Sequence, residues 1–274
     1  MPALVDSHVH LLPERLGSAI RAFFADHGID PARFAYPLDH DEICARLAAD
    51  GIAAAWTLPY VRRPGAADAL NASTAAIAAS QSAGPVEVIA GATVHPGDAD
   101  PVGVVRRAVE DLGARVLKLH CSVGDHSPDD PRLDAVWDWV SEVRLPVVVH
   151  AGHGVSGHTG AAELEPIGVV AARWPEARVV VAHCGHAAAA RTLELMTLHP
   201  SLHADLTPVV FELVDVPAPA ARALADRLLF GSDAPNTGFS AAEALAGLDR
   251  LELGDARAAV AGGTARRLVE EVAG

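Results

Sequence analysis

The sequence has little positive charge, few cysteines and no long hydrophobic run. Its 274 residues include 21 Lys and Arg against 35 Asp and Glu, which gives a formal net charge of −14. Proteins that bind nucleic acids or anionic membranes are normally basic, so we expect neither partner. No apolar run approaches the length that spans a bilayer, and the N-terminal residues lack the pattern of a signal peptide. We therefore expect a soluble cytoplasmic protein.

Cysteine and lysine are both scarce. Cys44, Cys121 and Cys184 are far apart and form no Cys-x-x-Cys pair, which predicts neither a disulfide framework nor a structural zinc finger. We expect each thiol to be a small buried apolar group in a reducing compartment. The chain has a single lysine, Lys118. A composition that favours arginine explains the general pattern but not why this position keeps lysine.

Short β-branched runs alternate with longer stretches rich in Ala, Leu, Arg and Glu, a pattern typical of strands and helices in alternation. Helical stretches lie in every gap, for example over 100–113, 130–143 and 241–253. The long gap 13–50 is expected to hold more than one helix. The expected strands cover residues 3–12, 51–60 (which is also compatible with a helix), 87–96, 114–122, 145–153, 177–185, 201–208 and 227–235.

Eight strands alternating with helices predict a parallel sheet covered by helices. Eight such units in 274 residues fit a (β/α)8 TIM barrel, with all of residues 1–274 in one domain. A doubly wound open sheet is the alternative fold. No G-x-G-x-x-G motif follows the first strand, which argues against the dinucleotide-binding form of that alternative.

The first expected strand carries two histidines. In a (β/α)8 barrel the active site lies at the carboxyl ends of the strands, so polar residues at those ends are candidate site residues. Side chains alternate along a strand, which places His8 and His10 on one face and Val5, Val9 and Leu11 on the other. Two histidines in this spacing predict half of a metal site or a pair of half-buried strand residues.

Later strand ends carry further polar residues: Lys118 and His120 on the fourth, His150 on the fifth, His183 on the sixth and Asp233 on the eighth. If these faces point to the barrel axis, the side chains meet at one mouth. Zn²⁺ takes imidazole and carboxylate ligands, usually three or four from protein, so the set predicts a divalent metal site. Asp233 can also take a proton from a water whose pKa the metal lowers to about 7.

Several residues have two interpretations. Lys118 either reacts with CO₂ to give a carbamate that bridges two metal ions, which arginine cannot do because it stays protonated, or is a substrate-binding cation or ion-pair partner. Arg62 and Arg63 follow the second strand, where they either bind a substrate carboxylate or are solvated. Further histidines near strand ends are candidates for contact with the substrate: His95, His120, His153 and His186.

The motifs DSHVH, VLKLHCS followed by SPDDPRL, LPVVVHAG, VVVAHCG and LLFGSDAP occur in this order over essentially the whole chain. As a set they resemble the amidohydrolase superfamily, and more narrowly its amidohydrolase-related branch, which includes aminocarboxymuconate-semialdehyde decarboxylase. Lys118 matches the carboxylated lysine of two-metal members, whereas the branch is mostly one-metal, so one or two ions remain open. The resemblance implies metal ligands at His8, His10, His150 and Asp233, and a second ligand or orienting group at His183.

The sequence therefore predicts a metal-dependent hydrolase, with Zn²⁺ as the expected ion, that acts on a C–N or C–O bond of a small molecule. Asp233 is the expected base, and His183 orients the water or stabilises the oxyanion. One alternative is a decarboxylase of a small carboxylic acid, and another is a non-catalytic barrel with a structural metal. The sequence does not identify the substrate, and a homo-oligomer is compatible with it.

Overall fold

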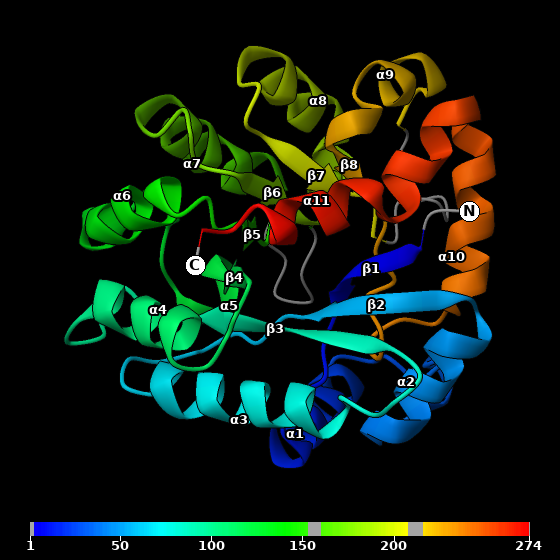
Figure 1. Ribbon diagram of the computed structural model, residues 1–274, viewed down its shortest axis with the longest axis horizontal. Helices are drawn as coiled ribbons and strands as arrows, with labels where there is room; N and C mark the ends of the chain where they lie inside the picture. The colour runs from blue at the N-terminus through cyan, green and yellow to red at the C-terminus, as the bar shows by residue number, and fades with distance from the viewer. Residues whose placement is uncertain (1–2, 153–159, 208–215, 274) are drawn as a thin grey trace.

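The computed structural model describes residues 3–152, 160–207 and 216–273. Eight parallel strands pair in chain order around a barrel, and helices follow them on the outside (Figure 1). The run 51–60 contains a strand rather than a helix. The strands are β1 (Leu4–Val9), β2 (Ile52–Thr57), β3 (Glu87–Thr93), β4 (Val116–Leu119), β5 (Val147–Val149), β6 (Val179–Val181), β7 (His203–Asp205) and β8 (Leu228–Leu229).

The end of the sheet returns to its beginning. Val9 forms a parallel bridge with Ala234, beyond β8. The Ser7 amide donates to the Phe230 carbonyl at 2.9 Å, and the Asp233 amide donates to the His8 carbonyl at 2.9 Å. These bonds join β1 to the segment after β8. The fold is therefore the predicted (β/α)8 TIM barrel.

Helices lie between successive strands. The gap 13–50 holds two α-helices, as expected, and the stretch 241–253 divides into α10 and the 3₁₀ turn Leu248–Leu251. The last helix, α11, crosses the barrel in Figure 1. The helices are α1 (Glu14–Asp26), α2 (His40–Ala49), α3 (Ala67–Ser80), α4 (Pro101–Glu110), α5 (Cys121–Gly124), α6 (Asp134–Glu142), α7 (Gly160–Arg173), α8 (Ala189–Leu198), α9 (Ala218–Ala223), α10 (Ala241–Gly247) and α11 (Thr264–Glu270).

Two apolar clusters separate the inside of the barrel from the layer under the helices. Alternate strand residues such as Val116, Val148 and Val180 pack inside with Leu268 of α11. Their neighbours in sequence, such as Leu117, pack in the larger outer cluster. This alternation follows the two-residue period of a strand. The inner cluster joins residues near the amino-terminal ends of the strands to α11. Helix α11 therefore closes the amino-terminal end of the barrel.

Strand β1 departs from the predicted alternation. Val9 and Leu11 pack in the outer cluster as expected, but Val5 packs in the inner one. The pairing of β1 with β2 shifts register between Leu4 and Val5 and again between Asp6 and Val9. Such irregularities change which face a side chain takes. The assignment of Val5 to the face opposite the histidines was therefore wrong.

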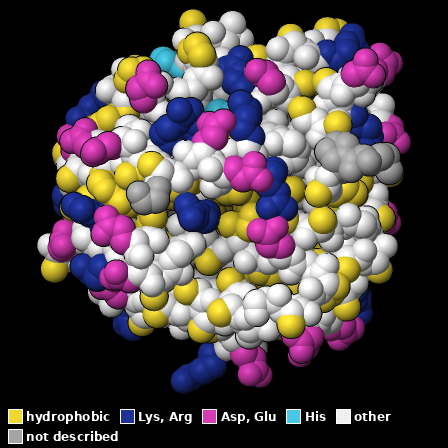
Figure 2. Space-filling view, in the orientation of Figure 1, with side chains coloured by type: hydrophobic (Ala, Val, Ile, Leu, Met, Phe, Trp, Pro, Cys, Tyr) yellow, Lys and Arg dark blue, Asp and Glu magenta, His cyan; other side chains and the backbone are white. Residues whose placement is uncertain are grey.

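The outer surface carries charges of both signs. On the face drawn in Figure 2, acidic and basic side chains are interspersed, and no large area of a single sign is visible. Within the described residues, no helix combines the length and the apolar character needed to cross a bilayer.

Candidate metal centre

Three predicted ligands from β1 and from the segment after β8 lie together. The Asp233 Oδ1 atom lies 3.2 Å from His10 Nε2 and 3.8 Å from His8 Nε2. Both imidazoles are buried, whereas the Asp233 side chain is 23% exposed. Burial raises the pKa of Asp233, but its interactions with His10, His8 and Lys118 lower it by more. The two histidines and the ionised carboxylate form a group that can hold a metal ion.

The hydrogen bonds of three histidines decide which ring nitrogen carries the proton. His8 Nδ1 donates to Asp205 Oδ2 at 2.9 Å, His10 Nδ1 to the Leu58 carbonyl at 2.7 Å, and His183 Nδ1 to the Thr207 carbonyl at 2.8 Å. Carbonyl and carboxylate oxygens only accept, so the proton of each neutral ring is on Nδ1. Each Nε2 then keeps its lone pair for a metal.

Asp205, the last residue of β7, is a site residue that the sequence reasoning missed. It is fully buried. Besides the bond from His8, its Oδ1 accepts from the backbone amides of His183 and Thr207 at 2.9 and 3.2 Å. Burial raises the pKa of Asp205, but the interactions with His8, His183 and Lys118 lower it by more. A carboxylate of this kind orients a metal-binding imidazole. The sequence signal that could have identified Asp205 was its position near the end of the expected strand 201–208.

His183 lies in a turn rather than in a strand. β6 ends at Val181, and His183, Cys184, Gly185 and His186 all have positive φ angles, from 46° to 72°. In a continued strand, His183 would point outward, since Val180 and Ala182 point inward. The left-handed turn instead brings its ring centroid to 4.7 Å from that of His8. Backbone strain of this type gathers at functional sites.

His150 follows β5 directly and borders the same space. Its ring centroid lies 5.0 Å from that of His183, and its ring stacks on His120 at 3.9 Å. The Nε2 atom of His150 is buried and makes no hydrogen bond with any described residue. Burial, followed by the charges of His120 and Lys118, lowers the pKa of His150 well below its ordinary value. His150 is therefore a neutral imidazole with a lone pair open to a ligand.

Lys118 in β4 is fully buried beneath the histidines. Its Nζ lies 3.5 Å from His8 Nε2. Burial lowers the pKa of Lys118 to about 8, partly offset by Asp205 and Asp233. The amine thus loses its proton more readily than an ordinary lysine, and the neutral amine is the form that reacts with CO₂. The geometry brings Lys118 into the predicted group.

A glycine lets the eighth strand approach the first. A Cβ on Gly231 would lie 2.7 Å from His8 Cβ and would collide with Thr207 Oγ1. Beside it, Asp6 Oδ1 accepts from the His8 amide at 3.1 Å and from the Ser232 amide at 3.0 Å. Burial raises the pKa of Asp6 to about 7. These contacts fix His8 and the segment that carries Asp233 relative to each other.

The remaining candidates differ in what their side chains contact. His120 borders the site through its stack on His150, and His186 stacks on His183 at 4.7 Å. His95 Nε2 instead donates to the Gly124 carbonyl at 2.9 Å. Arg62 and Arg63 are exposed between β2 and α3 and pair with none of the described residues. His153 lies outside the described residues.

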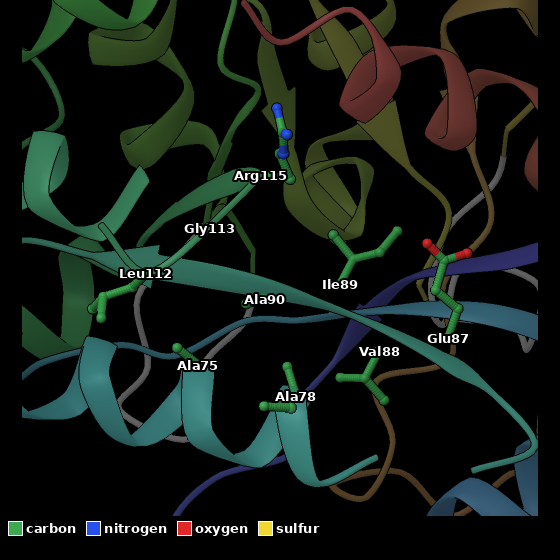
Figure 3. Close-up of a pocket in the computed structure, with 10 residues that line it drawn as sticks. Ala75, Ala78, Glu87, Val88, Ile89, Ala90, Leu112, Gly113 and Arg115 are labelled. Carbon is green, nitrogen blue, oxygen red and sulfur yellow. The ribbon is translucent and has the colours of Figure 1, made fainter. Parts of the chain in front are cut away.

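A groove on the outside of the barrel contains none of these residues. It lies between α3 and β3, has a volume of about 340 Å³ and is open to solvent (Figure 3). Small side chains of α3, such as Ala75 and Ala78, form one wall, and Leu112 and Arg115 border the other. The groove results from an alanine-rich helix on the sheet and offers no reactive group comparable to the histidines.

The chain was compared with protein families and with curated proteins. A family model described as Amidohydrolase matches residues 5–270. No curated protein matches significantly. The match covers nearly the whole chain, including all the site residues described above.

Several solved structures have the same architecture. An uncharacterized TIM-barrel protein from Bordetella bronchiseptica is 20% identical, with a TM-score of 0.75 over 98% of this chain and 99% of that chain. 5-Carboxyvanillate decarboxylase LigW from Sphingomonas paucimobilis is 15% identical, with a TM-score of 0.67 over 98% and 99%. Dihydroorotase from Saccharomyces cerevisiae is 14% identical, with a TM-score of 0.66 over 99% and 86%. At these identities, the likeness concerns the fold.

Proposed function

Because this chain belongs to the amidohydrolase family, we propose that it is a metal-dependent hydrolase of a C–N or C–O bond next to a carbonyl in a small molecule. The observation that carries the proposal is the protonation state of the histidines. His8, His10 and His183 each donate Nδ1–H to a protein acceptor, which leaves the lone pair of each Nε2 free. His8 and His10 form one possible metal-binding group with Asp233, and His183 forms a second with His8 and Asp205. Side chains buried only for packing do not need this arrangement.

The residues present fit a divalent ion. His8, His10, His150 and Asp233 supply three imidazoles and one carboxylate, the donor set that suits Zn²⁺. The buried Nε2 of His150 has no hydrogen bond among the described residues, and an ion would satisfy it. We propose Zn²⁺ as the ion on the basis of this donor chemistry.

The protein side chains have separate tasks in the proposed reaction. A bound ion supplies polarisation of the substrate carbonyl and lowers the pKa of water to about 7. Asp233 takes a proton from the attacking water and returns it to the leaving group. His183, whose Nε2 keeps its lone pair, accepts a hydrogen bond from that water and so orients it. Asp205 holds both His8 and the turn that carries His183.

The number of ions depends on Lys118. If its neutral amine added to CO₂ and released a proton, the resulting carbamate would supply a further anionic group, and together with His183 it would hold a second ion. If Lys118 keeps its amine, the site holds one ion and His183 acts on water alone. Mass spectrometry of the intact protein distinguishes the two, because carboxylation adds about 44 Da, and metal analysis should then give two ions or one.

The hydrolase proposal is tested with the purified protein before and after metal removal. We expect zinc-dependent turnover in a panel of cyclic amides, lactones and aryl esters, lost on chelation and restored by Zn²⁺. Asp233→Asn should lower kcat/KM about 10²–10⁴-fold. Asp98→Asn is a matched control, since Asp98 is a buried carboxylate that binds the backbone amides of Gly65 and His95 instead. Failure to bind metal under any loading condition would refute the proposal.

A decarboxylase is the second candidate function. The observation that favours it is the pair of exposed cations Arg62 and Arg63, which follow β2 at the carboxyl end of the barrel and form no ion pair with any described residue. Such cations can bind the carboxylate that a decarboxylase substrate carries. Release of CO₂ from aromatic or conjugated acids, lost in Arg62→Ala and Arg63→Ala with metal retained, would support this reaction over hydrolysis.

A further inference from the structure

Tyr60 borders the proposed metal site at the carboxyl end of β2. It lies two residues beyond Leu58, whose carbonyl holds His10 Nδ1. The Tyr60 ring meets His10 edge-on, with 5.5 Å between centroids and an interplanar angle of 88°. The ring centroid of His120 lies 4.8 Å from that of Tyr60. Tyr60 is thus a neighbour of both a proposed metal ligand and a second imidazole.

The hydroxyl of Tyr60 has no hydrogen-bond partner among the described residues, although its side chain is only partly exposed. The other tyrosine of the chain behaves differently, since the hydroxyl of Tyr36 accepts from the Ala241 amide at 2.7 Å. A half-buried phenol usually finds a partner for its hydroxyl. The ring of Tyr60 is therefore fixed by packing, while its hydroxyl is left for another molecule.

His120 offers a second group in the same place. Its ring is fixed by the stack on His150, and its Nδ1 lies 3.3 Å from Ser122 Oγ. Its Nε2 makes no hydrogen bond within the described residues. The Tyr60 hydroxyl and His120 Nε2 thus belong to neighbouring rings beside His10 and His150, and neither atom has a partner among the described residues.

We propose that Tyr60 and His120 form a subsite for a neutral oxygen of the substrate, a carbonyl or hydroxyl oxygen next to the group that reacts. This inference rests on the proposed metal-dependent function and adds a substrate class to it. The Tyr60 phenol is an uncharged donor and the imidazole of His120 offers a further ring nitrogen, so the pair suits a neutral oxygen, whereas a carboxylate suits an arginine. A site built to bond such an oxygen discriminates against an analogue that lacks it.

The test uses two zinc-binding probes that differ by one oxygen. Benzohydroxamate and 2-hydroxybenzohydroxamate both chelate zinc, and the second carries an additional hydroxyl beside the chelating group. Isothermal titration of the zinc-loaded protein should give a dissociation constant about 3- to 10-fold lower for the hydroxylated probe, as expected for one hydrogen bond. Tyr60→Phe keeps the ring packing and should abolish this preference without changing the zinc content.

Tyr36→Phe is the matched control, because it also removes one tyrosine hydroxyl, and it should keep the wild-type preference. Equal preference in wild type and Tyr60→Phe would overturn the subsite, and so would the absence of any preference in a wild-type protein that binds both probes. If zinc loads but neither probe binds, or if no zinc loads, the proposed function fails and the subsite fails with it. The two failures are thus distinguishable.

Discussion

Replacing Asp205 by Asn should change the tautomer of His8. The two carboxylate oxygens of Asp205 have different partners: Oδ1 accepts from two backbone amides, and Oδ2 accepts from His8 Nδ1 at 2.9 Å. In Asp205→Asn, the amide oxygen can keep the backbone partners, which leaves the amide nitrogen against His8. Two donors then face each other, and the proton of His8 must move to Nε2. The lone pair that faces Asp233 is lost.

The expected magnitude follows from this single contact. A hydrogen bond to a charged group contributes about 1.5–3 kcal/mol. A tenfold change in affinity corresponds to about 1.4 kcal/mol, so the loss amounts to about one to two decades. Removal of a carboxylate that orients a zinc-binding histidine typically costs about 10- to 100-fold in metal affinity, which agrees with that estimate. We expect zinc to bind Asp205→Asn about 10- to 100-fold more weakly than wild type.

Competition with a chromophoric chelator measures the zinc affinity, and urea denaturation of the metal-free protein measures the stability separately. Asp98→Asn again serves as the control. Asp98 is also buried and binds two backbone amides, at 2.6 and 2.9 Å, but neither belongs to a proposed ligand. It should lose stability and keep its zinc affinity. Wild-type zinc affinity in a folded Asp205→Asn would show that the Nδ1–H assignment of His8 is incorrect.

Two further predictions concern the packing and the charge of the site. Gly231→Ala puts a methyl group against His8 Cβ and Thr207 Oγ1. It should lower the free energy of unfolding, measured by urea denaturation, by about 1–3 kcal/mol and should weaken zinc binding. An unchanged free energy of unfolding would contradict the close approach of the two strands. The pKa of Lys118 is about 8 in the folded protein and 10.5 in an ordinary lysine. Between pH 8 and 10.5 the unfolded chain therefore binds more protons than the folded one, and the free energy of unfolding of the metal-free protein should rise with pH by up to about 3 kcal/mol. The difference between the stability curves of wild type and Lys118→Met against pH isolates this rise. If the two curves run parallel, the lowered pKa of Lys118 is refuted.

The barrel was predictable because its signals are local. Buried β-branched runs such as 147–149 mark strands, and the stretches between them are long enough for one helix each. The strand boundaries were less predictable. The run 227–235 was expected to be one strand, yet only Leu228–Leu229 pairs as β8, and Asp233 lies in a turn with a φ of 65°. Only Phe230 is apolar between β8 and Gly231, so the predicted strand included polar residues that lie beyond the paired part of the chain.

Side-chain direction was predictable only while the chain stayed extended. The two-residue period places Lys118 inside the barrel, since β4 includes that residue. The same rule applied to β6 would have pointed His183 toward the helices, and it is the left-handed turn after Val181 that brings the ring inward. Whether a histidine at a strand end reaches the site thus depends on backbone angles that the residue type does not encode.

The missed residues, Asp205 and Tyr60, share a physical reason for being missed. Neither resembles a metal ligand by spacing, because each contacts partners far away in the sequence. Asp205 bonds a histidine 197 positions earlier, and Tyr60 contacts the rings of His10, just after β1, and His120, just after β4. Only barrel closure brings these partners within reach. A sequence pattern can identify groups that bind an ion directly, whereas the groups that fix their protons and shape the space beside them emerge only from the three-dimensional arrangement. For this reason, Asp205→Asn and Tyr60→Phe test the structure more stringently than removal of a histidine ligand, which both sequence and structure predict to be damaging.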